Sequence, residues 1–384
     1  MKVRLLLCFV FLITANLLGQ KTVNITFKVS TPVISDTSTI YIAGNKKALG
    51  SWNPAAVFLE KMNESEWSKQ IQFEKGDILE FKFTKGSWET EAVDSAGNTP
   101  QNYIITVSED TTLSFNIDKW KDEFGSKIIV KGQITGTIQY HKNLKGKGLL
   151  PRDVLVWLPP DYYADTFINY PVLYMHDAQN LFDPATSSFG VDWQIDEAAD
   201  SLIRCSLLDP FIIVGINNTI DRKAEYTITD KGSAYMKFIV ENVKPMIDSL
   251  YRTKPDRDNT VTGGSSAGGL ISFMLLWEYN KVFAKAICMS PAYKVKSETT
   301  DINFVDDVEN YNGIKKQIKL YIDNGGIGLE AILQPGIDDM INTLKNKGYI
   351  EGKDFLWIKD PESAHSEAAW AKRIPGALKF IFSK

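Results

Sequence analysis

Apolar and polar residues alternate in short runs between residues 22 and 120. Alternation with a period of two over four to eight residues is typical of half-buried β-strands. The runs are separated by Gly, Asn and Asp and span residues 23–29, 39–42, 67–73, 78–83, 103–107 and 112–117. We therefore predict an all-β, immunoglobulin-like sandwich over residues 20–122.

After the polar segment 121–127, continuous apolar runs alternate with longer segments of helical periodicity. The predicted strands span residues 154–158, 172–175, 211–216, 261–263, 286–289, 319–322 and 355–358. The predicted helices include residues 193–205, 234–251, 268–279 and 336–347. Alternation of buried strands with helices is typical of a mainly parallel sheet covered on both faces. We therefore predict an α/β domain over residues 128–384.

The first nineteen residues have a different pattern. Lys2 and Arg4 precede an apolar run over residues 5–18, which Gly19 follows. A basic start before a short apolar run is typical of a secretory signal peptide, and this run is shorter than the roughly 20 residues of a membrane span. We predict a cleaved signal peptide at residues 1–19, no membrane span in the mature protein, and export to a periplasm or out of the cell.

The charge balance and the cysteines narrow the possible partners. The chain has 43 Lys and Arg against 47 Asp and Glu, which gives a net charge of -4. Nucleic-acid binding requires an excess of basic residues, so no nucleic-acid partner is expected. After the signal peptide only Cys205 and Cys288 occur, which we expect to be inert, buried thiols. No Cys and His spacing typical of zinc is present, and no metal or organic cofactor is expected.

One glycine-rich turn has the pattern of a nucleophile elbow. The predicted strand at 261–263 leads into Gly-x-Ser-x-Gly at residues 264–268, and a predicted helix follows. A serine on such a sharp turn presents its hydroxyl above the sheet, and small neighbours let the substrate approach. Ser266 is therefore the candidate nucleophile. The alternative is a glycine turn without chemistry.

A serine nucleophile requires a base, and the chain has only three histidines. His141 lies in a Lys-rich segment that we predict to be a surface loop. His176 follows a predicted strand and, with Asp177, is expected to shape the next loop. Only His365 follows Ser266 in the chain, as the order serine, acid, histidine requires. We therefore predict His365 as the base.

Two carboxylates are candidates for the acid that orients His365. Asp323 directly follows the predicted strand 319–322, whereas Glu330 follows the glycine-rich loop after it. We favour Glu330 and keep Asp323 as the alternative. The oxyanion requires backbone amides, for which we predict Ala267 and, after the strand ending at residue 175, either Ala178 or Gln179.

Four motifs carry a resemblance to a known family. They are His-Asp-x-Gln-Asn-Leu-Phe-Asp at 176–183, Asp-Arg-x-x-Glu-Tyr at 221–226, Gly-x-Ser-x-Gly at 264–268 and His-x-Glu-x-x-Trp at 365–370. Together they resemble the esterase D-like branch of the α/β-hydrolases, which includes the feruloyl and acetyl xylan esterases of carbohydrate esterase family 1 and the enterobactin-type siderophore esterases.

The resemblance covers roughly residues 128–384 and implies an α/β-hydrolase fold with Ser266 as nucleophile and His365 as base. One departure is Ala178, where the family commonly has Gly, so a positive φ there would be strained. Arg222 and Trp193 are candidate substrate-binding residues. Arg222 alternatively pairs with Glu225.

The N-terminal segment has a resemblance of its own. Tyr-Ile-Ala-Gly-Asn at 41–45, Leu-Gly-Ser-Trp-Asn-Pro at 49–54 and Trp-Glu at 88–89 are similar to starch-binding modules of carbohydrate-binding family 20. In that family two tryptophans form a sugar platform, here Trp52 and Trp88, because a flat indole covers the apolar face of a pyranose. Lys82 is the candidate partner for a sugar hydroxyl. The alternative is that both tryptophans only pack.

These features predict an exported serine esterase that acts on a small-molecule or oligosaccharide ester, such as an acyl or feruloyl group on a carbohydrate. One alternative substrate is a siderophore trilactone of the enterobactin type. Another alternative is a catalytically inactive protein that only binds glycan.

Overall fold

The computed structural model describes residues 22–32, 34, 38–95, 97, 99–100, 102–124, 133–188, 190–297 and 300–383. The chain forms two compact units, Met1–Glu123 and Phe124–Lys384. The predicted signal peptide at residues 1–19 lies outside the described residues. Within the described ranges, every helix is too short or too polar to cross a bilayer.

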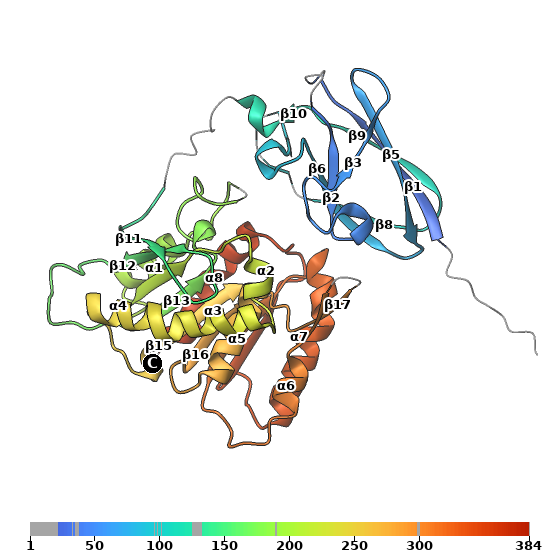
Figure 1. Ribbon diagram of the computed structural model, residues 1–384. Coiled ribbons are helices and arrows are strands. Elements are labelled where there is room, and N and C mark those ends of the chain that lie inside the picture. The colour runs from blue at the N-terminus through green and yellow to red at the C-terminus, as the bar shows by residue number, and fades with distance from the viewer. Residues whose placement is uncertain are drawn as a thin grey trace, which may run out of the picture. The chain divides into compact units, whose positions relative to one another are not determined.

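The first unit is a β-sandwich, as predicted. One four-stranded sheet has the order β4 (Glu60–Lys61), β5 (Glu66–Glu74), β1 (Thr22–Ser30), β9 (Thr111–Asn116) (Figure 1). The other has the order β3 (Val57–Phe58), β2 (Tyr41–Gly44), β6 (Ile78–Thr84), β8 (Tyr103–Thr106). The short strands β7 (Ala92–Val93) and β10 (Lys119–Trp120) pair separately. The described residues also form the 3-10 turns η1 (Lys47–Leu49) and η2 (Trp88–Thr90), and η3 (Lys121–Phe124) spans the boundary between the units.

Alternate residues of the strands fill the core between these two sheets. Phe27 of β1 and Phe81 of β6 are fully buried, and their rings meet edge to face at 5.2 Å. Edge-to-face contact aligns the positive ring edge with the negative ring face, so these pairs add to the stability gained from burial. The period of two predicted from the sequence thus places apolar residues between the sheets.

The second unit is built on a single eight-stranded sheet. Its order is β11 (Thr137–Leu144), β12 (Arg152–Leu158), β14 (Ile212–Ile216), β13 (Val172–His176), β15 (Thr260–Ser265), β16 (Lys285–Met289), β19 (Lys319–Asn324), β20 (Phe355–Lys359). The pairs that join β11 to β12 and β12 to β14 are antiparallel, and all others are parallel. The predicted mainly parallel sheet is therefore confirmed.

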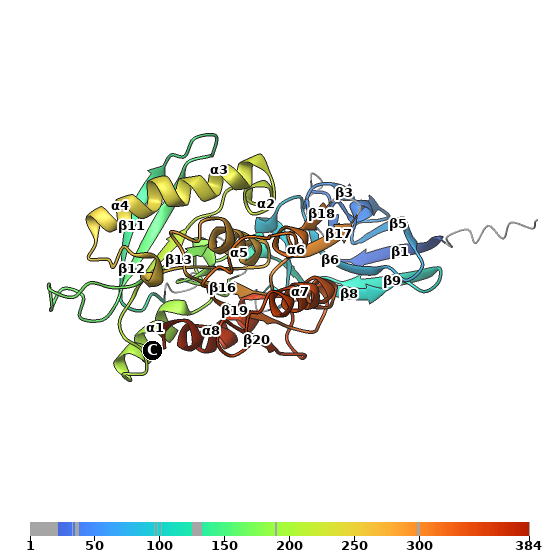
Figure 2. The ribbon, with the colours of Figure 1, turned by 90° about the horizontal axis from the view of Figure 1, so that it is seen from below.

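Helices cover both faces of this sheet (Figure 2). On one face lie α1 (Ile195–Arg204) and α8 (Glu367–Phe382). The other face packs against α3 (Asp230–Phe238), the π-helical turn η5 (Ile239–Val243), α4 (Lys244–Leu250), α5 (Ala267–Glu278), α6 (Val305–Glu309) and α7 (Leu329–Asn346). The remaining elements are η4 (Ala178–Asn180), α2 (Arg222–Glu225), η6 (Arg257–Asn259), β17 (Lys294–Ser297) and β18 (Thr300–Asn303).

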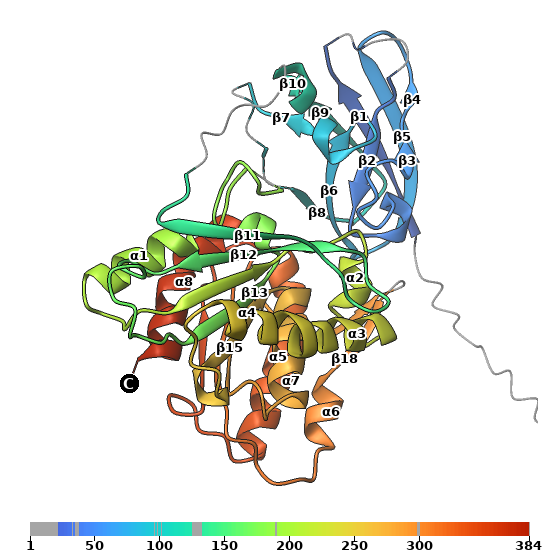
Figure 3. The same ribbon diagram turned by 60° about the vertical axis from the view of Figure 1, so that its left-hand side comes forward.

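Two expectations for this unit are wrong. His141 lies on strand β11, beside β12 (Figure 3), and not in a loop. β11 is an edge strand with mostly exposed or half-buried residues, so it lacks the apolar run on which the strand predictions depended. Cys205 is exposed at the end of α1, where the helix terminates, whereas Cys288 is buried within β16 as expected.

Candidate active site

Ser266 sits on a strained turn between β15 and α5. Its backbone has φ 57° and ψ −123°, a region that residues other than glycine rarely occupy. The turn is held by the end of β16, because the Ser266 amide donates to the carbonyl of Met289 (2.9 Å) and the Ala292 amide donates to the carbonyl of Ser266 (3.1 Å). The half-buried serine is thus fixed at the carboxyl edge of the parallel strands.

One glycine of the turn, Gly264, is required by close backbone approach. A Cβ at Gly264 would lie 2.8 Å from the carbonyl carbon and oxygen of Gly268, closer than real Cβ contacts allow. The chain can therefore fold back on itself here only if residue 264 has no side chain. This contact explains why the motif has glycine two residues before Ser266, whereas a Cβ at Gly268 would meet nothing closer than a side-chain oxygen of Asp177 at 3.4 Å.

The structure brings His365 and Glu330 together. Nδ1 of His365 lies 3.1 Å from Oε1 of Glu330, with the histidine side chain 12% exposed and the glutamate fully buried. Although burial alone raises the pKa of Glu330, hydrogen bonds from His365 and Ser290 outweigh it and hold the pKa below its usual value. An ionised Glu330 accepts the Nδ1 proton of His365, which leaves Nε2 free to act as a base.

The alternative acid, Asp323, has a different partner. Its carboxylate forms a buried ion pair with Arg373 of α8, at 3.1 Å. Burial raises the pKa of Asp323 to about 6, against the lowering effect of Arg373. Of the two predicted carboxylates, Glu330 is therefore the one that contacts His365.

Ser290 is a site residue that the sequence analysis missed. Its buried hydroxyl donates to Oε1 of Glu330 (2.5 Å) and accepts from the indole of Trp370 (3.0 Å). Ser290 follows β16, between Met289 and Ala292, so the same short segment supports both the Ser266 turn and the acid. Its position directly after a buried parallel strand is the signal that would have identified it.

The candidate oxyanion amides lie at two neighbouring turns. Ala267 is the first residue of α5, and Ala178 and Gln179 begin η4 after β13, so these amides have no acceptor within their own helices. The strain expected at Ala178 does not occur, because the left-handed residue is its neighbour Asp177, with φ 59°. The Gln179 side chain exchanges hydrogen bonds with Asn218, which fixes this turn.

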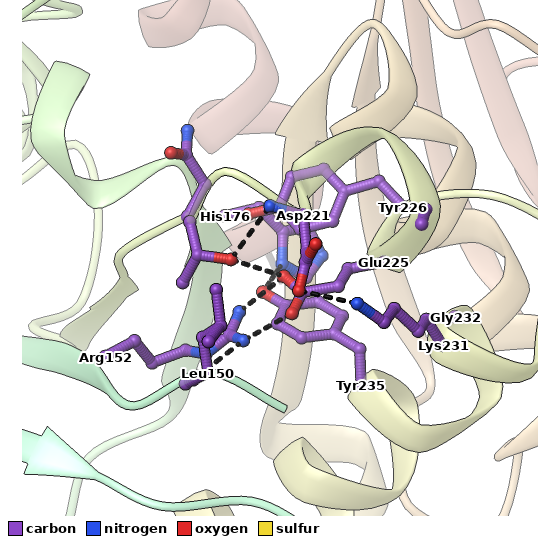
Figure 4. A network of polar contacts seen from close by, with 12 residues as sticks. Leu150, Arg152, His176, Asp221, Glu225, Tyr226, Lys231, Gly232 and Tyr235 are labelled. Carbon is purple, nitrogen blue, oxygen red and sulfur yellow. Dashed lines mark hydrogen bonds and ion pairs between the residues drawn. The ribbon is translucent and has the colours of Figure 1, made fainter. Parts of the chain in front are cut away.

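A buried polar network surrounds His176, the last residue of β13 before η4 (Figure 4). Nδ1 of His176 lies 2.9 Å from the hydroxyl of Tyr235, and burial lowers the pKa of His176 to about 3. Next to it, Arg152 forms a bidentate ion pair with Glu225, with distances of 2.8 and 2.6 Å, and both side chains are buried. His176 is thus neutral and structural, as expected.

Two candidate substrate-binding residues have other contacts. Arg222 forms a bidentate ion pair with Asp177, with two distances of 2.7 Å, so the predicted pair with Glu225 is wrong. Glu225 instead binds Arg152. Trp193 is 1% exposed and packs against Trp370 at 5.4 Å, a core position that does not fit the predicted contact with substrate. Arg222 keeps a third of its side chain exposed.

In the first unit, Trp52 and Trp88 lie side by side and half-buried, with ring centroids 6.4 Å apart and planes tilted by 43°. Lys82 does not fit its predicted contact with a sugar hydroxyl. It is 7% exposed and pairs with the buried Glu91 at 3.2 Å. Glu91 also binds Lys121, so this cluster serves the packing of the sandwich.

Comparison with known proteins gives one family match for each unit. Residues 150–381 match the Esterase family model, and residues 22–116 match the starch-binding domain model CBM_20. Amylopullulanase of Thermoanaerobacter thermohydrosulfuricus is 28% identical over 104 residues, which are 26% of this chain and 7% of that protein. The alpha-amylase of Niallia circulans is also 28% identical over 104 residues, which are 26% of this chain and 8% of that protein. The chain thus matches less than a tenth of either protein.

The uncharacterized protein YjcH of Bacillus subtilis is 25% identical over 178 residues, which are 46% of this chain and 70% of that protein. A ferulic acid esterase structure is 17% identical, covers 65% of this chain and 98% of its own, and has a TM-score of 0.53. The structure of the enterobactin esterase of Shigella flexneri in the presence of enterobactin is 12% identical. The match covers 95% of this chain and 94% of that chain, with a TM-score of 0.55. Both structures share the fold.

Proposed function

The chain belongs to the Esterase family, and from this membership and the site geometry we propose that it is a serine hydrolase of carboxylic esters. The observation that carries the proposal is the contact between His365 and Glu330 at the edge of the sheet where Ser266 occupies its strained turn. A serine, a histidine and a buried acid in this chain order match the roles of nucleophile, base and orienting group.

In the proposed reaction Ser266 Oγ attacks the ester carbonyl while His365 Nε2 takes the hydroxyl proton. The amides of Ala267 and of Ala178 or Gln179 stabilise the negative oxygen that develops. His365 then gives its proton to the departing alcohol, which leaves an acyl group on Ser266. Water, deprotonated by His365, attacks this acyl group. His365 returns the proton to Ser266 Oγ as the bond to the acyl group breaks, so the acid is released and the enzyme is back in its starting state.

The proposed substrate is an acyl or feruloyl ester on a carbohydrate, encountered outside the cytoplasm. The match of residues 22–116 to a starch-binding domain supports this choice, as does the adjacent pair Trp52 and Trp88. An ester on a polysaccharide is the substrate for which a glycan-binding module raises the local concentration of enzyme. Export rests on the predicted signal peptide at residues 1–19.

A siderophore trilactone is the second candidate substrate. One observation favours it, namely that the fold similarity to enterobactin esterase extends over 95% of the chain, whereas the similarity to ferulic acid esterase extends over 65%. Rates on feruloylated and acetylated oligosaccharides, measured beside rates on a catecholate trilactone, distinguish the two substrates.

Burst kinetics on 4-nitrophenyl acetate and butyrate test the mechanism. We expect the wild type to release a burst of nitrophenol that is absent in Ser266→Ala and His365→Ala. A Ser266→Ala variant with wild-type turnover would refute the acyl-enzyme. A wild type that binds starch but hydrolyses none of these esters would favour the inactive glycan-binding alternative.

A further inference from the structure

Three carboxylates converge where helix α1 begins. Asp192, Asp196 and Glu197 each place one oxygen so that the three oxygens lie within 4.8 Å of one another. None of them belongs to the candidate triad, and their residue types do not form the Cys and His spacing that is typical of a metal site in a sequence. Carboxylates are common at helix starts, so the pattern alone has little meaning.

The atoms that these carboxylates leave free are the informative observation. Asp196 is fully buried, and although its Oδ2 accepts from the Thr135 amide (2.7 Å), its Oδ1 has no hydrogen-bond partner among the described residues. Glu197 repeats this arrangement, since its Oε1 accepts from the Thr135 hydroxyl (3.3 Å) and its buried Oε2 is unpartnered. A buried polar atom without a partner is costly, so it points to a missing ligand.

The charge of the cluster is also uncompensated. Within the part of the chain that the structure describes, none of the three carboxylates forms a salt bridge with Lys, Arg or His. Asp183 adds a further like charge near Asp192. A buried group of carboxylates without a basic partner must be neutralised by protons or by a cation.

We propose that Asp192, Asp196 and Glu197 bind a divalent cation of the hard class, with Ca²⁺ as the ion that fits best. All the available ligands are oxygens, and no nitrogen or sulfur ligand that would favour zinc or copper belongs to the group. Ca²⁺ accepts irregular arrangements of carboxylates completed by water, whereas Mg²⁺ demands near-octahedral geometry and keeps its water.

The proposed cation site lies next to the segment that is hydrogen-bonded to the η4 turn of the candidate active site. Trp193, next to Asp192, donates its amide to the carbonyl of Asn180, and Ile195 donates to Leu181 (2.8 and 3.3 Å). Asn180 is the last residue of η4, the turn that holds the candidate oxyanion amides. A cation here fixes the start of α1 and, through these bonds, the segment after η4. Its role is structural, and it does not depend on the proposed esterase activity.

Thermal unfolding and terbium luminescence test the site. The protein is stripped with EGTA and then melted with and without CaCl₂; at about 100 times the Kd we expect the melting temperature to rise by roughly 5 °C or more. TbCl₃ should give emission sensitised by Trp193, the sequence neighbour of Asp192, and CaCl₂ should displace it. Asp196→Asn should abolish both responses.

Asp200→Asn is the matched control, because Asp200 lies on the same helix and the substitution removes the same charge. It should keep both responses. If Asp196→Asn fails to fold, Glu197→Gln takes its place. A wild type with no calcium-dependent melting shift and no sensitised terbium emission would overturn the proposal and assign neutralisation of the cluster to protons. Responses retained in both Asp196→Asn and Glu197→Gln would place the bound ion elsewhere and overturn it as well.

Discussion

The imidazole of His365 and the hydroxyl of Ser290 converge on one oxygen of Glu330, at 3.1 and 2.5 Å. The Glu330 carboxylate is buried, and these two contacts fix its orientation. Asp323, at the end of strand β19, is instead paired with Arg373. The two carboxylates that the sequence left as alternatives thus have separate partners, and substitution should separate their effects.

Glu330→Gln should lower kcat on 4-nitrophenyl esters by about 10²–10⁴-fold, because a neutral amide neither orients His365 nor stabilises its protonated form. Asp323→Asn should keep kcat within about threefold but lower the melting temperature, since Arg373 loses a buried charged partner. Steady-state kinetics and thermal unfolding of both variants check this. A larger loss of kcat in Asp323→Asn would reverse the assignment.

Ser266→Gly should be inactive and yet more stable than Ser266→Ala. The backbone at Ser266 has φ 57°, which costs on the order of 1–3 kcal/mol for a residue with a Cβ and little for glycine. We expect the free energy of unfolding to be about 1 kcal/mol higher for the glycine variant in urea titrations. Equal stability of the two variants would mean that the turn is not strained.

Much of the fold was predictable because burial imposes a period. Strand β13 has an unbroken apolar run since it is covered on both faces, and β1 alternates since one face meets the core. Strand β11 was not predictable in this way, because an edge strand with residues such as His141 has no apolar signal. The π-helical turn at Ile239–Val243 was also not predictable, since the apolar residues in it have the same spacing as in an α-helix.

The candidate site was predictable where covalent geometry limits the choice of residue and not where only packing decides. Glycine is required at 264 by the close approach of the Gly268 carbonyl, so the turn around Ser266 was visible. Contacts between residues far apart in the chain, such as Arg222 with Asp177, were not, because many acids were equally available. Ser290 and the carboxylates at the start of α1 have ordinary residue types, and only their positions in the fold distinguish them.

Substitution of Trp52 or Trp88 by Ala should weaken binding to insoluble starch by roughly tenfold each, because each indole then no longer covers a sugar face and a tenfold loss corresponds to about 1.4 kcal/mol. Rates on soluble nitrophenyl esters should not change, since both residues lie in the first unit. Pull-down on starch granules measures the binding. Unchanged binding in both variants would assign the two tryptophans to packing.

Arg152→Met should lower the free energy of unfolding by about 3–5 kcal/mol, because Glu225 remains as a buried carboxylate without its ion-pair partner. Adding Glu225→Leu should restore part of this loss, since the double variant has no unpaired charge. A double-mutant cycle in urea provides the coupling energy. Additive effects of the two substitutions would contradict the importance of the pair.

The buried His176 makes the protein sensitive to acid. Its pKa is lowered to about 3 by burial, whereas an exposed histidine has a pKa near 6.5. Between these values the unfolded chain binds a proton that the folded chain does not. The free energy of unfolding therefore falls as pH decreases from about 6.5 to 3, by up to about 1.4 kcal/mol per pH unit from this residue.

Buried carboxyls with raised pKa values, such as Glu367 at about 7, act in the opposite direction, because the folded state binds their protons more tightly. The quantity to measure is therefore the difference between the wild type and His176→Asn in urea unfolding at pH 7, 6, 5 and 4. We expect the unfolding free energy of the variant to gain on that of the wild type at each step below pH 6.5, with little change above it. Parallel pH profiles for the two proteins would show that His176 is protonated in the folded state, which its burial against Tyr235 opposes.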